Sequence, residues 1–161
     1  MSLLPVMMTV ILVLLDQGTK WQALRALKPI GNMTVLPGVM DFTFVENRGV
    51  AFGMFAGKRW LILLLTVVIA AGLVYYYRKL PRTRAYQWVR AALILILSGA
   101  IGNIIDRVFR GYVVDFFEVT FIQWPVFNVA DIYVVVGVAL LILLILFVIK
   151  EEPAQKQQKD E

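Results

Sequence analysis

The sequence predicts an all-α membrane protein, a four-helix transmembrane bundle with a small extracytoplasmic β-sheet and a short interfacial helix. Two observations lead to this fold class. Apolar residues make up 60% of the 161 residues and the mean hydropathy is +0.78, whereas a soluble domain has roughly 45–50% apolar residues. In addition, four apolar stretches approach the ~20 residues that a helix needs to cross ~30 Å of hydrocarbon. We therefore expect a single membrane domain at residues 1–150 and a disordered tail at 151–161.

The four expected spans are Leu3–Trp21, Trp60–Tyr77, Tyr86–Ile105 and Val126–Ile149. The first stretch has no Lys or Arg ahead of it and no clear small-residue cleavage site after it. We therefore interpret it as a retained span, with a processed signal peptide as the alternative.

The basic stretch RKLPRTR determines the expected orientation. It contains four cations within the seven residues that connect the second and third spans: Arg78, Lys79, Arg82 and Arg84. Cytoplasmic loops of membrane proteins are enriched in Lys and Arg, so we interpret this cluster as a topogenic signal and expect no nucleic-acid partner. Both termini are then cytoplasmic, and the connections at 22–59 and 106–125 face the outside.

The first external connection carries signals of its own. The stretch MTVLPGVMDFTFVEN has rough alternation of Thr, Val and Phe around the turn signal Pro37-Gly38, which predicts short strands at about 33–46. The stretch GVAFGMFAGKRW is apolar and interrupted by glycines. We expect it to lie in the membrane interface as a short helix or loop.

The residues that are absent limit the chemistry. The chain contains no Cys and no His, which excludes Ser-His-Asp and Cys-His catalysis and the usual zinc sites. We therefore expect neither a metal nor another cofactor. Any acid or base catalysis depends on carboxylates, Lys or Tyr.

The acidic residues gather on one side of the predicted membrane. Of the eleven Asp and Glu residues, four lie in the tail, and the other seven map to external loops or the external ends of spans. Ionisable residues at membrane depth are costly and are functional candidates by default. Here such candidates come from three spans and one loop.

Each of these acids also has a structural interpretation. Asp16 and Lys20 have the i,i+4 spacing of a helical ion pair, and Asp106 can join a polar network with Arg107 and Asn103. Asp131 opens the fourth span, where a carboxylate complements the helix dipole. Asp115 is harder to explain structurally, because it lies within the apolar and aromatic run YVVDFFEVTFI.

A pair formed by Asp115 and Asp131 predicts a specific chemistry. Two nearby carboxylates cannot both ionise easily, so they share a proton. The ionised member can activate water, and the protonated member can donate to an amide carbonyl. This is peptide hydrolysis without a nucleophilic side chain, a metal or a cofactor.

Five motifs, in this order, resemble those of the bacterial lipoprotein signal peptidases (signal peptidase II). They are DQGTK at 16–20, ENRGVAFG at 46–53, GAIGNIIDR at 99–107, VVDF at 113–116 and WPVFNVAD at 124–131. The resemblance covers roughly residues 10–148. It implies that Asp115 and Asp131 are the catalytic dyad and that Asn128 supports it.

The resemblance also implies roles for the remaining motif residues. It implies that Asn103 and Asp106 support the site and that Arg107 faces the substrate backbone. Asn47 and Gly49 match the motif beside the substrate groove. Two further residues match a motif that is treated as structural support, Asp16 and Lys20.

The resemblance further implies the substrate and the location. The substrates are prolipoproteins whose lipobox Cys carries a diacylglyceryl group, and the cut falls just before that Cys. We accordingly expect a multi-pass protein of the bacterial cytoplasmic membrane that is surrounded by membrane lipids, acts as a monomer and has its active site at the outer face.

Three other interpretations of the residues remain open. A small transporter could use buried acids as a proton relay, although the acids gather at one face rather than at the midplane. An intramembrane aspartyl protease of the presenilin type has its acids within the spans. A structural four-span subunit would not need FNVAD and GNIIDR in this arrangement.

Overall fold

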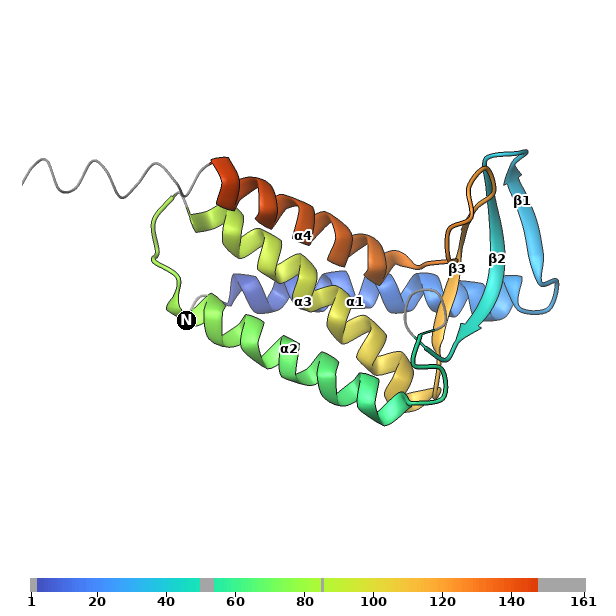
Figure 1. Ribbon diagram of the computed structural model, residues 1–161, viewed down its shortest axis with the longest axis horizontal. Helices are drawn as coiled ribbons and strands as arrows, with labels where there is room; N and C mark the ends of the chain where they lie inside the picture. Colours follow the sequence, from blue (N-terminus) through green and yellow to red (C-terminus); the bar gives the residue numbers. More distant parts are fainter. Residues whose placement is uncertain (1–2, 50–53, 85, 148–161) are drawn as a thin grey trace, which may run out of the picture.

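The computed structural model describes residues 3–49, 54–84 and 86–147, and over these residues it is mostly helical (Figure 1). Its long helices are α1 (Leu4–Gln22), α2 (Arg59–Lys79), α3 (Tyr86–Phe109) and α4 (Val129–Phe147). Helix α3 continues past the predicted end at Ile105, because its polar last turns find partners on other elements. The predicted tail at 151–161 lies outside the described residues.

Helices α2, α3 and α4 are long and apolar enough to cross a membrane. Helix α1 has 19 residues but is not among them, because its last turns carry the polar side chains of Asp16, Gln17 and Lys20. Three of the predicted spans are therefore confirmed as apolar helices of sufficient length. The remaining span, Leu3–Trp21, stays a prediction.

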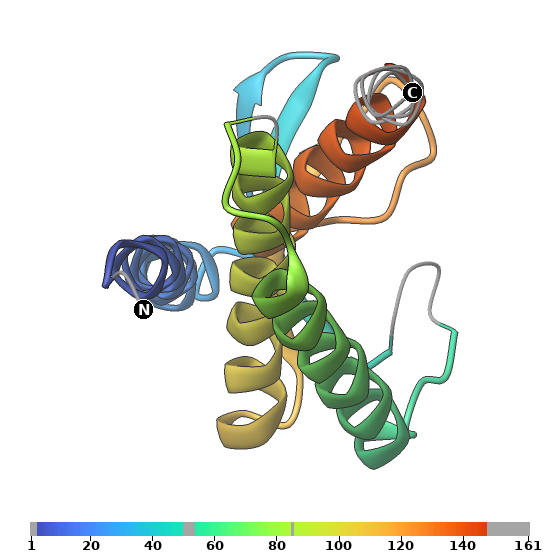
Figure 2. The ribbon, with the colours of Figure 1, turned by 90° about the vertical axis from the view of Figure 1, so that its left-hand side faces the viewer.

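Helix α3 is the centre of the helical part, and α1, α2 and α4 pack around it (Figure 2). In its apolar window 44% of the residues are buried, against 11% in α2 and 17% in α4. Small residues allow this close packing. A Cβ atom on Gly99 would lie 2.3 Å from the carbonyl oxygen of Ala130, and one on Gly102 would lie 2.4 Å from Asp16 Oδ2.

A three-stranded antiparallel sheet covers one end of the helices. Strands β1 (Asn32–Leu36) and β2 (Met40–Asn47) form the predicted hairpin, whose turn has Gly38 at φ 73° and a hydrogen bond from Val39 N to Leu36 O. Strand β3 (Val113–Val119) pairs with β2. The sheet packs on the π-helical turn η1 (Ala23–Leu27) that extends α1.

One feature differs from the sequence prediction, and another is described only in part. Strand β3 was not predicted, because the connection at 106–125 was interpreted by topology alone. The expected interfacial helix falls partly on residues 50–53, which lie outside the described residues, and residues 54–57 form turns ahead of α2. Gly57, at φ 81°, interrupts any helix at this point.

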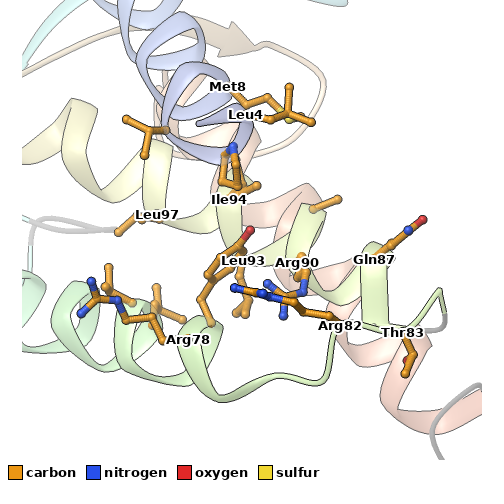
Figure 3. A pocket seen from close by; sticks show the side chains of 16 residues that line it. Leu4, Met8, Arg78, Arg82, Thr83, Gln87, Arg90, Leu93, Ile94 and Leu97 are labelled. Atoms are coloured by element: carbon orange, nitrogen blue, oxygen red, sulfur yellow. The ribbon is translucent and has the colours of Figure 1, made fainter. Parts of the chain in front are cut away.

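The two ends of the molecule differ in charge and in packing. All the acidic residues of the described ranges lie at or near the sheet end, namely Asp16, Asp41, Glu46, Asp106, Asp115, Glu118 and Asp131. At the opposite end, where the 80–84 connection joins α2 to α3, a cavity of about 990 Å³ opens between α1, α2 and α3 (Figure 3).

Candidate active site

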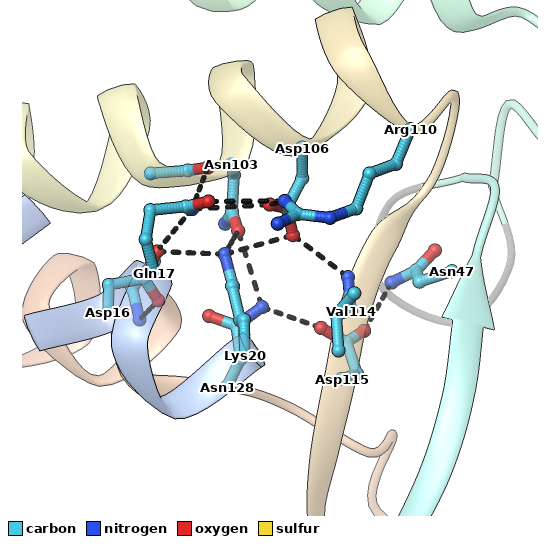
Figure 4. A network of polar contacts seen from close by, with 12 residues as sticks. Asp16, Gln17, Lys20, Asn47, Asn103, Asp106, Arg110, Val114, Asp115 and Asn128 are labelled. Carbon is cyan, nitrogen blue, oxygen red and sulfur yellow. Dashed lines mark hydrogen bonds and ion pairs between the residues drawn. The ribbon is translucent and has the colours of Figure 1, made fainter. Parts of the chain in front are cut away.

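The candidate site lies where the last turns of α1 and α3 and the first turn of α4 meet strands β2 and β3 (Figure 4). All the sequence-predicted site residues come to this region. They are Asp16, Lys20, Asn47, Gly49, Asn103, Asp106, Arg107, Asp115, Asn128 and Asp131.

Asp115 is positioned by strand β3. Its neighbour Val114 donates its backbone N–H to Asp106 Oδ2 at 3.0 Å, which ties the strand to α3, and Val45 of β2 pairs with Asp115 in the sheet register. The Asp115 side chain is only 1% exposed. Both its oxygens accept amide hydrogen bonds, Oδ2 from Asn47 Nδ2 at 2.8 Å and Oδ1 from Asn128 Nδ2 at 2.6 Å.

Burial and the nearby charge of Asp131 raise the pKa of Asp115 to about 7. Burial is the larger cause, since removing a carboxylate from water disfavours its charged form. The amide hydrogen bonds from Asn47 and Asn128 oppose the shift without cancelling it. Asp115 is therefore a carboxyl group that can hold a proton near neutral pH.

Asp131 lies in the first turn of α4 and is half-buried. It exchanges hydrogen bonds with Asn128: Asp131 N donates to Asn128 Oδ1 at 3.0 Å, and Asn128 N donates to Asp131 Oδ2 at 3.1 Å. This is the reciprocal pattern of a helix capping box. The other oxygen, Oδ1, accepts a hydrogen bond from Asn103 Nδ2 at 2.8 Å. The start of α4 also favours negative charge here, because the positive end of the helix dipole lies there.

Asn128 and Asn103 connect the two acids. The Asn128 side-chain amide donates to Asp115 and also to Asn103 Oδ1, at 3.2 Å, while its oxygen and backbone hold Asp131. Asn128 is fully buried. A single asparagine thus bonds both carboxyl groups and fixes their relative orientation.

A second group of buried charges lies behind the dyad, and we call Asp16, Lys20 and Asp106 the ion cluster. Each of the three is 0% exposed. Lys20 Nζ lies 3.0 Å from Asp16 Oδ2 and 3.3 Å from Asp106 Oδ2, and donates to Asn103 Oδ1 at 2.9 Å. Asp16 Oδ1 accepts the backbone N–H of Ala130 at 3.0 Å. The ion cluster therefore joins α1 to α3 and to the start of α4.

Sequence reasoning missed two members of this network, Gln17 and Arg110. Gln17 Nε2 donates to Asp106 Oδ1 at 3.2 Å and to the carbonyl oxygen of Gly102 at 3.2 Å. Arg110 bonds both Asp106 and Gln17 Oε1. The i,i+4 spacing of Asp106 and Arg110 was a signal that could have identified the arginine.

Arg107 joins α3 to the segment that follows β2. Its Nη2 donates to the carbonyl oxygen of Gly49 at 2.9 Å, and the side chain is only 8% exposed. The Gly49 N–H in turn donates to Asn47 Oδ1 at 3.0 Å. Because Asn47 bonds Asp115, this chain of contacts extends from Arg107 to the dyad.

The arrangement presents two carboxyl groups that neutral amides orient next to the ion cluster, and one of them, Asp115, can hold a proton near neutral pH. Within the described ranges, no three acidic side chains come together in a way that could hold a metal ion.

Comparison with known proteins gives a consistent result. A family model described as Signal peptidase (SPase) II matches residues 8–147. The lipoprotein signal peptidase of Caldanaerobacter subterraneus subsp. tengcongensis is 47% identical over 135 residues, which cover 84% of this chain and 90% of that protein. The lipoprotein signal peptidase of Halalkalibacterium halodurans is 40% identical over 153 residues, covering 93% and 94% of the two chains.

Solved structures agree with these sequence relatives. A bacterial membrane enzyme determined by the in meso method at 2.3 Å resolution has a TM-score of 0.79 and 31% identity, over 98% of this chain and 90% of that chain. A second one, at 1.9 Å resolution, has a TM-score of 0.77 and 34% identity, over 89% and 92%.

Proposed function

Because the chain belongs to the signal peptidase II family, we propose that it is an aspartyl endopeptidase that removes signal peptides from diacylglyceryl-modified prolipoproteins. It cuts just before the lipidated lipobox Cys, at the outer face of the bacterial cytoplasmic membrane. The observation that carries the proposal is the junction at Asn128, which hydrogen-bonds both Asp115 and Asp131.

The two carboxyl groups take different roles. Asp131 is the general base, since it lies at the N-terminus of α4 and accepts hydrogen bonds from Asn103 Nδ2 and Asn128 N. Asp115 is the general acid, since its pKa of about 7 leaves it able to carry a proton near neutral pH.

The reaction then needs no covalent intermediate. Asp131 takes a proton from a water molecule, whose oxygen attacks the scissile carbonyl carbon, while Asp115 gives its proton to the carbonyl oxygen. The tetrahedral intermediate collapses as the amide nitrogen takes a proton from Asp131 and the C–N bond breaks. Asp115 recovers its proton as the carbonyl re-forms, so the dyad ends with the single proton with which it began.

The supporting residues keep this geometry constant. Asn47, Asn103 and Asn128 orient the carboxyl groups, and the ion cluster holds α1, α3 and α4 together at the site. The segment at Gly49, tied to Arg107, lies beside Asn47 and bounds the position of the peptide. We propose that the protein acts as a monomer in which α1 is the fourth span and both termini are cytoplasmic.

The substrate lipid provides the first test. We expect an unlipidated lipobox peptide to be cleaved far more slowly than its diacylglyceryl form, mainly through a higher KM. Each buried methylene contributes ~0.8 kcal/mol of affinity, so two acyl chains dominate binding. Steady-state kinetics on the two peptides, with Asp115→Asn as the inactive control, measures the difference. Equal kcat/KM values for the two peptides would contradict the proposed specificity for lipoproteins and would indicate a general membrane aspartyl peptidase.

The orientation provides an independent test. A reporter fused after Arg84 should be cytoplasmic, because the cations Arg78, Lys79 and Arg82 lie just before the junction. One inserted next to Gly38, in the β1–β2 turn, should be extracytoplasmic. The location of each reporter is measured by adding a protease to intact cells and to lysed cells and comparing how much of the reporter is cleaved. The reverse labelling would put the dyad on the cytoplasmic side and contradict the proposed site of action.

A further inference from the structure

The cavity between α1, α2 and α3 lies at the end of the helices away from the dyad, and the proposed reaction does not use it. Its volume of about 990 Å³ is at the upper end of the roughly 300–1,000 Å³ of small-molecule sites. Figure 3 shows Leu4 and Met8 of α1 on one side of the cavity and Arg78 of α2 on the other.

The depth of the cavity matches one leaflet of a bilayer. Along α3 its lining extends from Gln87 to Leu97, which is ~15 Å at 1.5 Å per residue. A hydrocarbon core is ~30 Å thick. The cavity wall is also open sideways, since Leu4 and Val6 of α1 are 62% and 52% exposed and face the surroundings of the helices as well.

The charges of the cavity are all of one sign. Arg78, Arg82 and Arg90 line it at the end next to the 80–84 connection, and no described Asp or Glu lies among the lining residues. Arg90 is held in position: its Nη2 donates to the carbonyl oxygen of Leu80 at 2.6 Å, and its guanidinium lies over the Tyr77 ring. Guanidinium groups match phosphate oxygens in geometry and charge.

The geometry points to a binding site for one anionic phospholipid, with the phosphate at Arg78, Arg82 and Arg90 and an acyl chain along Met8, Leu73 and Leu97. The inference depends on the proposed membrane insertion but not on the peptidase reaction. The cavity has a cationic end and apolar walls that open toward the lipid. This combination favours a phospholipid over a soluble anion, because only a phospholipid can occupy both the cationic end and the apolar part.

Matched variants of the full-length protein in detergent test this site. Phosphatidylglycerol is titrated against phosphatidylcholine with the same acyl chains, and binding is followed by native mass spectrometry and by the thermal unfolding midpoint. In Arg82→Gln we expect about fivefold weaker binding of phosphatidylglycerol, and a further fivefold loss in Arg78→Gln/Arg82→Gln.

The control variants remove as many positive charges as the test variants, from neighbouring residues that do not line the cavity. Arg84→Gln and Lys79→Gln/Arg84→Gln change residues that are exposed and do not line it, so they should bind like the unchanged protein. Leu97→Phe, which fills the deep end of the cavity, should weaken phosphatidylglycerol binding while leaving every cation in place.

Three results would each overturn the inference. Equal binding of phosphatidylcholine would remove the role of charge, and equal loss in the Lys79 and Arg84 controls would reduce it to a general surface attraction. A stabilisation by inorganic phosphate as large as that by phosphatidylglycerol would assign the arginines to a soluble anion. Peptidase activity is measured in parallel, and an inactive protein that still binds the lipid would count against the proposed function alone.

Discussion

Two groups of buried or half-buried carboxylates lie next to each other at the sheet end of the molecule, and their partners differ. In the ion cluster, Asp16 and Asp106 contact the Lys20 ammonium, and Asp106 also contacts Arg110. Among the described residues, Asp115 and Asp131 form no ion pair and are held by amide N–H groups.

This difference separates ion-paired carboxylates from carboxylates that are held by neutral groups alone. A cation in contact with a buried carboxylate offsets part of the free-energy cost of burying its charge, and removing either partner leaves an uncompensated buried charge. Neutral amides also orient a carboxyl group, but they oppose its protonation less than a cation does. The molecule therefore contains one set of acids that holds helices together and another that can exchange a proton.

The largest effect is expected from removing a dyad carboxylate. Asp115→Asn and Asp131→Asn should each lower kcat by at least ~10³-fold, since general acid–base groups contribute about 10²–10⁴-fold each and act as a unit. Both proteins should remain folded and membrane-inserted. Cleavage of the lipidated peptide and size-exclusion profiles in detergent measure the two quantities.

A matched control is Asp41→Asn, which removes a carboxylate from the same sheet but away from the dyad. Asp41 pairs with Glu118 in the sheet register, and its side chain contacts Asn32. Its turnover should be close to that of the unchanged protein. Near-normal turnover in either dyad variant would contradict the assignment of the catalytic pair.

The next effect is on the pH dependence. Asp115 must carry a proton to act as the acid, and its pKa is about 7, so kcat/KM should fall about tenfold per pH unit above that value. Initial rates on the lipidated peptide across the neutral and mildly alkaline range measure this limb. A flat profile above pH 7 would assign the transferred proton to another group.

Stability should follow the same group. The folded pKa of Asp115 lies above its ordinary value of 3.8, so the folded protein binds the proton more tightly than the unfolded chain. This contribution is complete below pH ~4 and is lost as the pH rises to about 7. The unfolding midpoint of Asp115→Asn should lack this component of the pH dependence.

The smallest effect on turnover is expected from the ion cluster. Asp16→Ala or Lys20→Ala should lower the free energy of unfolding by about 3–5 kcal/mol, while the remaining folded enzyme keeps most of its turnover. Lys28→Ala, which breaks the exposed pair with Glu46, is the control and should be nearly neutral. An Asp16 variant with unchanged stability and no activity would move Asp16 into the catalytic set.

The sequence predicted the long helices well, because each of them is encoded by one continuous apolar stretch and needs no information from distant residues. It did not predict strand β3, although VVDFFEV is rich in β-branched and aromatic residues. The connection at 106–125 was only assigned to the outer side of the membrane, and its residues were not examined for strand patterns. The pairing of β3 with β2 joins Val45 to Asp115 across a long separation. Periodicity within one segment contains no information about such a partner.

For the candidate site, the motifs identified the titratable groups but not the contacts between them. The hydrogen bond from Asn128 to Asp115, and the bond from Val114 to Asp106 that fixes the strand, depend on how α3, α4 and β3 approach each other. Gln17 was overlooked although it belongs to the DQGTK motif, because only the charged residues of that motif were considered. Its role follows only from its position against Asp106.

The contact from Ala130 N to Asp16 joins residues 114 positions apart, and this separation has a consequence for biosynthesis. At about 5–20 residues per second, a ribosome adds the intervening chain in roughly 6–23 s. During that interval Asp16 and Lys20 need no distant partner, because their i,i+4 spacing lets them neutralise each other as soon as α1 forms. The nascent chain can thus keep both ionisable groups in its first helix, and an incomplete chain that lacks α4 has no Asp131 with which to cut.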